Sequence, residues 1–285
     1  MGFFISQAIN GVVFGMLLFL LAAGLTLILG TMRIVNLAHG SFYLFGGYLG
    51  YSIFKYTGSF VLACAGGIVA IALLGILTYK VLLERRFARE TLAQVLITLG
   101  MLSIISDVCR WIWGGSPLSI PKPSVLDGNI DLGYAILPVY RLTVIIIGFL
   151  IFLFLWWFLE RTKYGAIVRA GVDDEEMAQA IGINIFVVKA LIFSMGALMA
   201  GFAGVVGAPF IGMSPGLDLE ILPLAIVVII IGGMGSLWGA LTGALIIGLV
   251  DAFGKSLLPE LSIFTIFAAM VVVLALRPGG LFGTR

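Results

Sequence analysis

Long apolar segments follow one another along almost the whole chain, and this pattern decides the fold class. A helix that spans a lipid bilayer needs about 20 mostly apolar residues. Of the 285 residues, 61% are hydrophobic and 11% are charged, whereas soluble domains carry about 25% charged residues. We therefore expect an all-α, polytopic integral membrane protein of about nine transmembrane helices, forming a single domain over residues 1–285. The expected spans are residues 4–29, 35–54, 59–82, 92–113, 140–159, 186–208, 219–232, 236–257 and 262–277.

Two of these segments are irregular and predict broken helices. The second begins with the polar string RIVNLAHGS, Arg33–Ser41, which a helix facing lipid would not tolerate. The seventh is short, with Pro223 near its start and Gly232 and Gly233 at its end. Interrupted backbone persists at membrane depth only where protein or a water-filled cavity surrounds it. We expect both segments to be buried within the protein.

One hydrophilic segment, Glu160–Lys189, interrupts the apolar pattern. Nine of its thirty residues are charged. Asp173 with Glu176 three residues later is typical of a helix N-terminus, and Gly182 is a stop signal. We expect a short helix over Asp174–Ile181 that lies in water and contacts another molecule there. An ordinary solvated loop is the alternative.

The distribution of Lys and Arg predicts the orientation. With the Glu84–Glu90 loop, the Glu160–Lys189 segment and the C-terminus on one side, that side holds 11 of the 16 basic residues. The positive-inside rule makes this side cytoplasmic and places the N-terminus outside. The first apolar segment lacks a basic n-region and a small-residue cleavage site, so we expect a retained span rather than a signal peptide. The proline-rich external connection, Gly114–Tyr140, is either a solvated connector or a docking surface.

Small residues recur at helical spacing. Gly235, Gly239 and Gly243 lie four apart, and two further series follow the same spacing. These series are Ala240, Ala244, Gly248, Ala252 and Ser256, and Gly196, Ala200 and Gly204. In lipid, small residues four apart let helix backbones approach closely. We expect tight helix packing, along seams that also allow helices to slide.

Catalytic signatures are absent from the sequence, which predicts that the protein is not an enzyme. It contains one histidine, no HExxH and no GxSxG. Gly254-Lys255-Ser256 resembles the end of a phosphate-binding loop, but Leu249 stands where the first glycine is required. The net charge of +2 does not indicate nucleic acid binding. We expect no metal ion and no cofactor, and we expect Cys64 and Cys109 to be packing residues.

Ionisable groups at membrane depth cost about 2.5–3.5 kcal/mol each at a helix centre, so each needs a reason. Asp107 and Arg110 lie three apart and are expected to pair, and Asp251 is expected near the outer end of its helix. The Arg33–Ser41 segment has two interpretations. It lines a route for a solute, or its histidine is a satisfied core residue. The candidate residues for the route are Asn36, His39, Gly40 and Ser41.

Several segments together resemble permease subunits of branched-chain amino acid ATP-binding-cassette importers, a family that also serves other hydrophobic amino acids. The most specific are NLAHG, from Asn36, and RPGGLFG, from Arg277. The other segments are Gly24–Gly50, Arg161–Ile183, Gly196–Pro209 and Gly232–Gly248. The likeness covers nearly the whole chain in the same order. Urea and short-chain amide permeases share these motifs and are the alternative function.

The resemblance implies a bacterial inner-membrane importer with divided labour. A solute-binding protein outside delivers the solute, this chain and a second homologous permease form the pathway, and two cytoplasmic ATPase subunits hydrolyse ATP. The Glu160–Lys189 segment corresponds to the loop that contacts the ATPases. The candidate coupling residues are Asp173, Asp174, Glu175, Glu176, Ala178, Ala180 and Gly182. An intramembrane enzyme would need a nucleophile or paired carboxylates within the membrane, and an ion-driven transporter would need a self-sufficient charged site.

Overall fold

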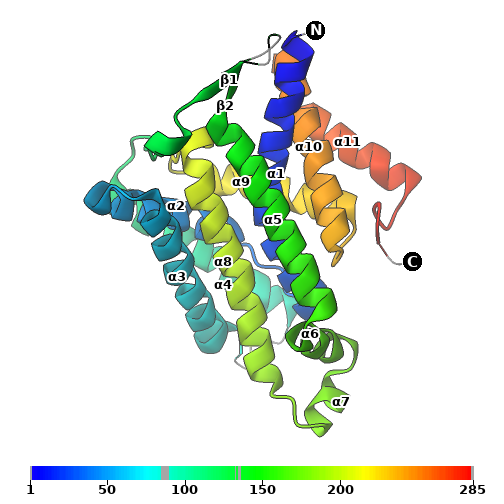
Figure 1. Ribbon diagram of the computed structural model, residues 1–285. Helices are drawn as coiled ribbons and strands as arrows, with labels where there is room; N and C mark the ends of the chain where they lie inside the picture. Colours follow the sequence, from blue (N-terminus) through cyan, green and yellow to red (C-terminus); the bar gives the residue numbers. More distant parts are fainter. Residues whose placement is uncertain (1, 85–89, 132, 134–135, 284–285) are drawn as a thin grey trace. The chain divides into compact units, whose positions relative to one another are not determined.

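The computed structural model describes residues 2–84, 90–131, 133 and 136–283, and these form a helical protein with one small hairpin (Figure 1). The apolar segments are joined by short connections, by one hydrophilic pair of helices, and by the longer segment between α4 and α5 that contains η3 and the hairpin. The elements are α1 Gly2–Met32, α2 His39–Thr57, α3 Phe60–Thr78, the π-helical turn η1 Tyr79–Leu83, α4 Thr91–Trp113, η3 Ser124–Leu126, β1 Asn129–Asp131, β2 Ile136–Pro138, α5 Val139–Arg161, α6 Lys163–Asp173, α7 Glu175–Ala180, α8 Ile185–Ile211, α9 Leu217–Gly232, α10 Leu237–Leu257, η4 Pro259–Leu261 and α11 Ser262–Leu276.

The all-α membrane fold expected from the sequence is confirmed. Each of the nine apolar segments contains one helix, namely α1 to α5 and α8 to α11. Within the described residues, seven helices are long and apolar enough to cross a bilayer. The two expected helices that miss this criterion are α2, with 19 residues, and α9, with 16. These are the segments that the polar string and Pro223 marked as irregular.

Serine hydroxyl groups cap the N-termini of two of the transmembrane helices. The Oγ of Ser59 accepts a hydrogen bond from the backbone N–H of Leu62 at the start of α3. Ser236 does the same for the N–H of Gly239 at the start of α10, over 3.0 Å. Each bond satisfies one N–H group that has no acceptor inside its own helix. The chain therefore turns sharply between neighbouring spans without leaving these donors unpaired.

The chain forms two compact units, each assembled from segments distant in the sequence. One contains residues 24–120 and 153–222, and the other contains residues 1–23, 121–152 and 223–285. We call them the α2–α8 unit and the α1–α10 unit, after helices at their centres.

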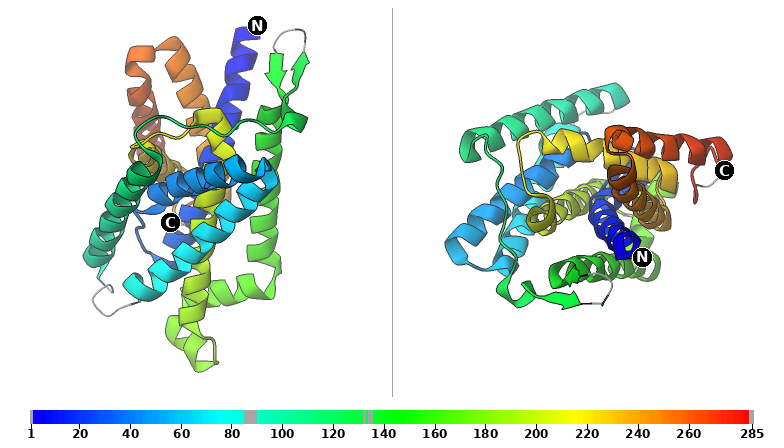
Figure 2. Two further views of the ribbon diagram at one scale, coloured as in Figure 1. Left: turned by 90° about the vertical axis from the view of Figure 1, so that its left-hand side faces the viewer. Right: turned by 90° about the horizontal axis from the view of Figure 1, so that it is seen from above.

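In the α2–α8 unit, small residues bring α2 and α3 onto α8. Gly46 of α2 lies directly against the backbone of Gly201, and Gly204 lies against the carbonyl of Tyr43. α3 runs antiparallel to α8, because a Cβ on Gly75 would lie 2.7 Å from the Cβ of Ala197 while Gly67 faces Val205. α2, blue in Figure 2, crosses the yellow-green α8 rather than running beside it. A Cβ on Gly196 would lie 2.7 Å from the carbonyl oxygen of Gly24 of α1, so the expected close packing at Gly196 and Gly204 is present.

In the α1–α10 unit, glycines again set the spacing. Gly248 packs on Gly11 and Gly15 of α1, and Gly239 packs on Gly232 of α9. These contacts confirm tight packing along the small-residue series of α10. Gly235 differs, because it lies in the turn before α10 with φ of +81°.

The segment after α11 is fastened to the end of α9. The N–H of Leu281 donates to the carbonyl of Ile231 over 2.8 Å, and the N–H of Phe282 donates to Gly232 over 2.9 Å. A Cβ on Gly280 would lie 2.6 Å from the nitrogen of Gly233, so a glycine is required there. The RPGGLFG motif thus satisfies backbone carbonyls that α9 leaves open at its C-terminus.

Candidate transport site and coupling segment

The turn between α1 and α2 carries the polar string predicted to line a solute route. α1 ends at Met32, and Arg33 adopts a left-handed conformation with φ of +53°. The carbonyl of Asn36 then accepts the N–H of His39 over 3.3 Å. α2 begins there, with Ala38 as its N-cap and no side-chain capping bond. A buried helix N-terminus without a capping side chain is unusual, because its first N–H groups have no acceptor inside the helix.

Three other helices of the α2–α8 unit surround this turn. From α4, the hydroxyl of Thr98 donates to the carbonyl of Val35 over 3.3 Å. From α1, a Cβ on Gly24 would lie 3.1 Å from Cε1 of His39. From α9, the carbonyl of Asp218 lies 2.5 Å from the position of a Cβ on Gly40. The polar turn is therefore enclosed by protein, as expected for interrupted backbone at membrane depth.

All four candidate route residues are buried in this one turn and the start of α2. They are Asn36, His39, Gly40 and Ser41. The hydroxyl of Ser41 donates to the carbonyl of Ala38 over 2.9 Å. Both amide atoms of Asn36 are buried and have no hydrogen-bond partner among the described residues. A buried amide without partners costs free energy, which makes Asn36 the member of this set whose polarity the fold does not explain.

The sequence interpretation missed Asp218, which lies in the first turn of α9. Its side chain is fully buried. The hydroxyl of Ser106 on α4 donates to Oδ2, whereas Oδ1 has no hydrogen-bond partner among the described residues. The sequence did contain a signal for this residue, since Asp218 is an acidic residue that follows Gly216 and Leu217 at the start of an apolar segment. Because the expected span began at residue 219, Asp218 fell in a connection.

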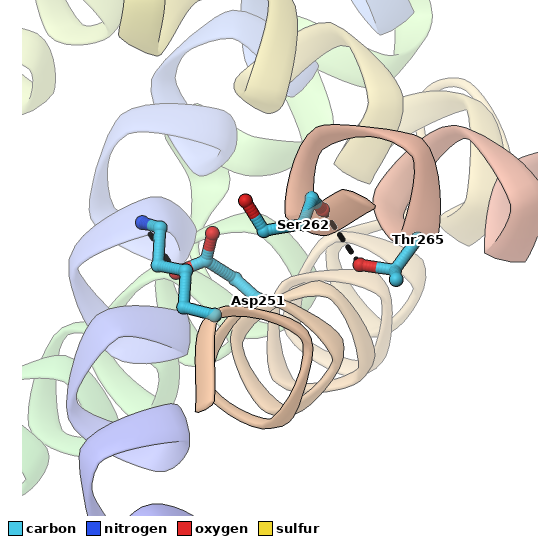
Figure 3. Close-up of polar contacts among 4 residues, drawn as sticks. Asp251, Ser262 and Thr265 are labelled. Carbon is cyan, nitrogen blue, oxygen red and sulfur yellow. Dashed lines mark hydrogen bonds and ion pairs between the residues drawn. The ribbon is translucent and has the colours of Figure 1, made fainter. Parts of the chain in front are cut away.

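Two other acidic residues behave differently from Asp218. Asp107 and Arg110 are both exposed on α4, and no salt bridge joins them in the part of the chain that the structure describes, so the expected pair is wrong. Asp251 is buried, but Lys255 one turn later places its Nζ 2.9 Å from Oδ2 (Figure 3). Nearby, Thr265 of α11 donates to the carbonyl of Ser262 over 2.6 Å and lies against Gly254. The buried charge of Asp251 is therefore balanced by Lys255 of the same helix.

The hydrophilic segment folds into two helices rather than one. Thr162 caps α6 by accepting the N–H of Gly165 over 3.1 Å, a helix that the sequence interpretation missed. Asp174 caps α7 by accepting the N–H of Met177 over 2.9 Å. The expected cap, Asp173, is instead the last residue of α6, so that assignment was wrong by one residue. Gly182 follows α7 with φ of +90°, in agreement with the expected stop.

The exposed face of α7 differs from the one inferred from sequence. Ala178, a candidate coupling residue, is only 2% exposed, whereas Met177 is 60% and Ile181 is 69% exposed. Ile181 directly follows α7 and lies four residues after Met177, which places the two side chains on one face. Glu176 and Ala180 are also exposed. The side chains of Asp173 and Glu175 lie outside the described set.

A cleft of about 760 Å³ lies beside α7. Its walls combine carboxylates and a lysine with aromatic and aliphatic side chains. It is lined by Met32, Ile34, Tyr79, Leu83, Glu84, Gln94, Glu176, Gln179, Ile185, Phe186 and Lys189. The same cleft therefore touches α7, the start of α8 and the chain just before Asn36.

Residues 7–276 match the family model described as the branched-chain amino acid transport system / permease component. This match covers nearly all of the chain, including the polar turn, both hydrophilic helices and the glycine series. The chain belongs to this family. We refer to it below as the permease.

Named relatives resemble the permease over nearly its whole length. It is 30% identical to LivH, the high-affinity branched-chain amino acid transport system permease protein of Escherichia coli strain K12, over 99% of its own length and 96% of the relative. It is 25% identical to BraD of Pseudomonas aeruginosa, with 98% and 96% covered. A probable LivH of Methanocaldococcus jannaschii is 30% identical, with 96% and 91% covered. These three relatives are named as transport permeases rather than enzymes.

Proposed function

We propose that the permease is the membrane-spanning subunit of an ATP-binding-cassette importer for branched-chain or other hydrophobic amino acids. The observation that carries this proposal is the near full-length match to permeases that are named for branched-chain amino acid transport. The alternative, a urea or short-chain amide permease, is not favoured by these relatives. A pathway with few charged groups suits a zwitterionic solute with an aliphatic side chain.

The partners follow from this assignment. A second homologous permease completes the pathway, two cytoplasmic ATPase subunits bind and hydrolyse ATP, and a solute-binding protein delivers the amino acid from outside. The permease itself binds no nucleotide, metal or nucleic acid. Residues 1–285 act as one permease domain, and residues 160–189 form its cytoplasmic coupling loop.

The orientation rests on the basic residues. The side that carries α6 and α7 is cytoplasmic, the N-terminus is outside, and the C-terminus is cytoplasmic, in the bacterial inner membrane. Four of the basic residues counted for this side, at positions 85, 86, 89 and 285, lie outside the described residues. In this orientation, α7 presents Met177 and Ile181 to an ATPase subunit.

The mechanism we propose is alternating access. Closure of the ATPases on ATP pushes α7, and α6 and the start of α8 transmit the push to the membrane helices. Gly171 of α6 supports this route, because a Cβ there would lie 3.3 Å from Cδ1 of Ile185. Helices then shift along their glycine contacts, and the turn that holds Asn36 and His39 becomes accessible from the other side.

The test is ATP-driven uptake of labelled leucine by the complete assembly in proteoliposomes. Met177→Glu places a charge on the exposed face of α7 and should abolish uptake and co-purification of the ATPases, because it removes an apolar contact. Met177→Leu keeps an apolar side chain and should retain both. Normal uptake by Met177→Glu would refute the coupling role of α7, and uptake of urea but not leucine by the wild type would refute the substrate class.

A further inference from the structure

Two helices, α2 and α9, have their first turns in the α2–α8 unit and begin close to each other in its buried interior. α2 starts at His39 and α9 starts at Leu217. The carbonyl of Asp218 lies 2.5 Å from the position of a Cβ on Gly40, so the two first turns are in contact. Each helix N-terminus carries about half a positive charge, from N–H groups that have no acceptor in the helix. The first turns of the two helices are thus brought together in a buried position, where Leu217, Leu219 and Glu220 of α9 already donate to the carbonyls of Ser214 and Gly216.

The start of α2 keeps donors available at this point. The side chain of Ala38 supplies no capping bond. The N–H of His39 donates to the carbonyl of Asn36, and the N–H of Phe42 donates to the carbonyl of Ala38. The N–H groups of Gly40 and Ser41 have none there. Gly40 has no side chain that could cover them. This arrangement resembles the interrupted helices that bind the carboxylates of solutes in transporters.

Asp218 supplies the opposite charge. It is fully buried, Ser106 donates to Oδ2, and Oδ1 has no partner among the described residues. No salt bridge reaches Asp218 in the part of the chain that the structure describes. A buried carboxylate that is ionised requires a cation or further hydrogen bonds. The side-chain amide of Asn36, in the turn before α2, is 1% exposed and without a partner in the described chain, so it also lacks a structural explanation.

We propose that this point is the site where the permease holds the charged head of its substrate. Oδ1 of Asp218 accepts a hydrogen bond from the α-ammonium group, and the N–H groups of Gly40 and Ser41 donate to the α-carboxylate. The Asn36 amide provides a further donor and acceptor. The inference rests on the proposed function and adds the recognition site to it.

These groups are buried in the present conformation, so a solute reaches them only when the starts of α2 and α9 separate. The site then exists for a limited part of the transport cycle, which suits a pathway that must release its substrate. The proposed site at Asp218 recognises only the charged head of the amino acid, so recognition of the solute's side chain takes place elsewhere.

The first experiment compares Asp218→Asn with Glu220→Gln in the complete assembly. Asp218→Asn keeps the shape of the side chain and removes its charge, so ATP-driven uptake of labelled leucine should fall about tenfold or more, while ATP hydrolysis stimulated by the binding protein persists. Glu220 is exposed two residues later, so Glu220→Gln should transport normally. Unchanged uptake by Asp218→Asn would overturn the site. Failure of the wild type to import leucine would overturn the proposed function instead.

The second experiment needs no variant and therefore does not depend on how Asp218→Asn folds. Thermal unfolding of the wild-type permease, purified with its partners and trapped with a non-hydrolysable ATP analogue, is measured with leucine, 4-methylpentanoate or 3-methylbutylamine. Leucine should raise the unfolding temperature, and the acid and the amine should each raise it much less. Equal shifts with the amine alone, or with sodium ions alone, would assign Asp218 to a cation and overturn the zwitterion site. The absence of a leucine shift would also overturn it.

Discussion

At the scale of single residues, the closest helix contacts depend on the absence of a side chain. Gly204 of α8 lies against the carbonyl of Tyr43, and a Cβ there would also lie 2.9 Å from the nitrogen of Gly47. Backbone atoms cannot move aside as the end of a flexible side chain can. Gly204 therefore fixes the distance between α2 and α8.

Gly204→Ala should lower the free energy of unfolding by about 1–3 kcal/mol, the usual cost of overpacking. Gly100 is the matched control, since it lies in α4 and a Cβ added to it would meet no atom within 4 Å. Gly100→Ala should leave stability unchanged or raise it by up to about 1 kcal/mol, because alanine favours helix. Thermal unfolding of the two variants in detergent measures the difference, and equal melting temperatures would contradict this account of Gly204.

The sequence was most informative about residues whose polarity conflicts with lipid. Asn36 and His39 stood out because polar side chains interrupted an apolar segment, and they are buried together as expected. Asp218 was missed because an acidic residue near a segment end is commonly interfacial. Its burial depends on α4 and α2, which are distant in the sequence. Ala178 was chosen over Met177 because the face that α7 buries is set by tertiary packing, which no local pattern reveals.

At the scale of elements, α7 is too short to be stable by its own hydrogen bonds. Its six residues extend about 9 Å, and isolated helices of this length are not stable in water. The Asp174 cap and the contacts with α6 and α8 are what hold it. The coupling role proposed for α7 requires that this short helix keep its shape.

Asp174→Ala should remove about 1 kcal/mol of helix stability by deleting the cap. Hydrogen exchange of residues 175–180 should become faster, and leucine uptake should fall while ATP hydrolysis continues. Asp174→Asn keeps an oxygen that can accept the N–H of Met177, so exchange should stay close to that of the wild type. Exchange that is equally slow in Asp174→Ala and the wild type would show that the cap is not needed.

Element boundaries were predicted unevenly, for identifiable reasons. The irregular helices α2 and α9 could be predicted, because the NLAHG string and Pro223 are incompatible with a continuous lipid-facing helix. α6 was not predicted because the acidic residues after it give a stronger helix-start signal, although Thr162 is a cap residue. The π-helical turn at Tyr79–Leu83 has no local signal, since its apolar residues fit an α-helix equally well.

At the scale of the whole molecule, composition and apolar periodicity predict the membrane class and the succession of helices. They do not predict the division into two compact units. Residues 1–23 and 223–285 belong to one unit although they stand at opposite ends of the chain. That association depends on backbone contacts such as Gly248 with Gly11, which become visible only in three dimensions.

The orientation of the permease can be tested with single cysteines in a variant that lacks Cys64 and Cys109. Met177→Cys and Val125→Cys are suitable, since the native side chains are 60% and 90% exposed. A membrane-impermeant maleimide applied to intact cells should label residue 125 and not residue 177. Inverted vesicles should give the reverse pattern. Labelling of residue 177 in intact cells would place α7 outside and contradict the assignment to an ATPase contact.

The attachment of Leu281 and Phe282 to the end of α9 has a consequence for biosynthesis. Until the ribosome has made these residues, the carbonyls of Ile231 and Gly232 lack the donors that satisfy them in the finished protein. α9 can therefore enter the membrane early but cannot complete its end until about fifty residues later. A nascent chain arrested after α11 would therefore hold α9 with these two carbonyls still unpaired.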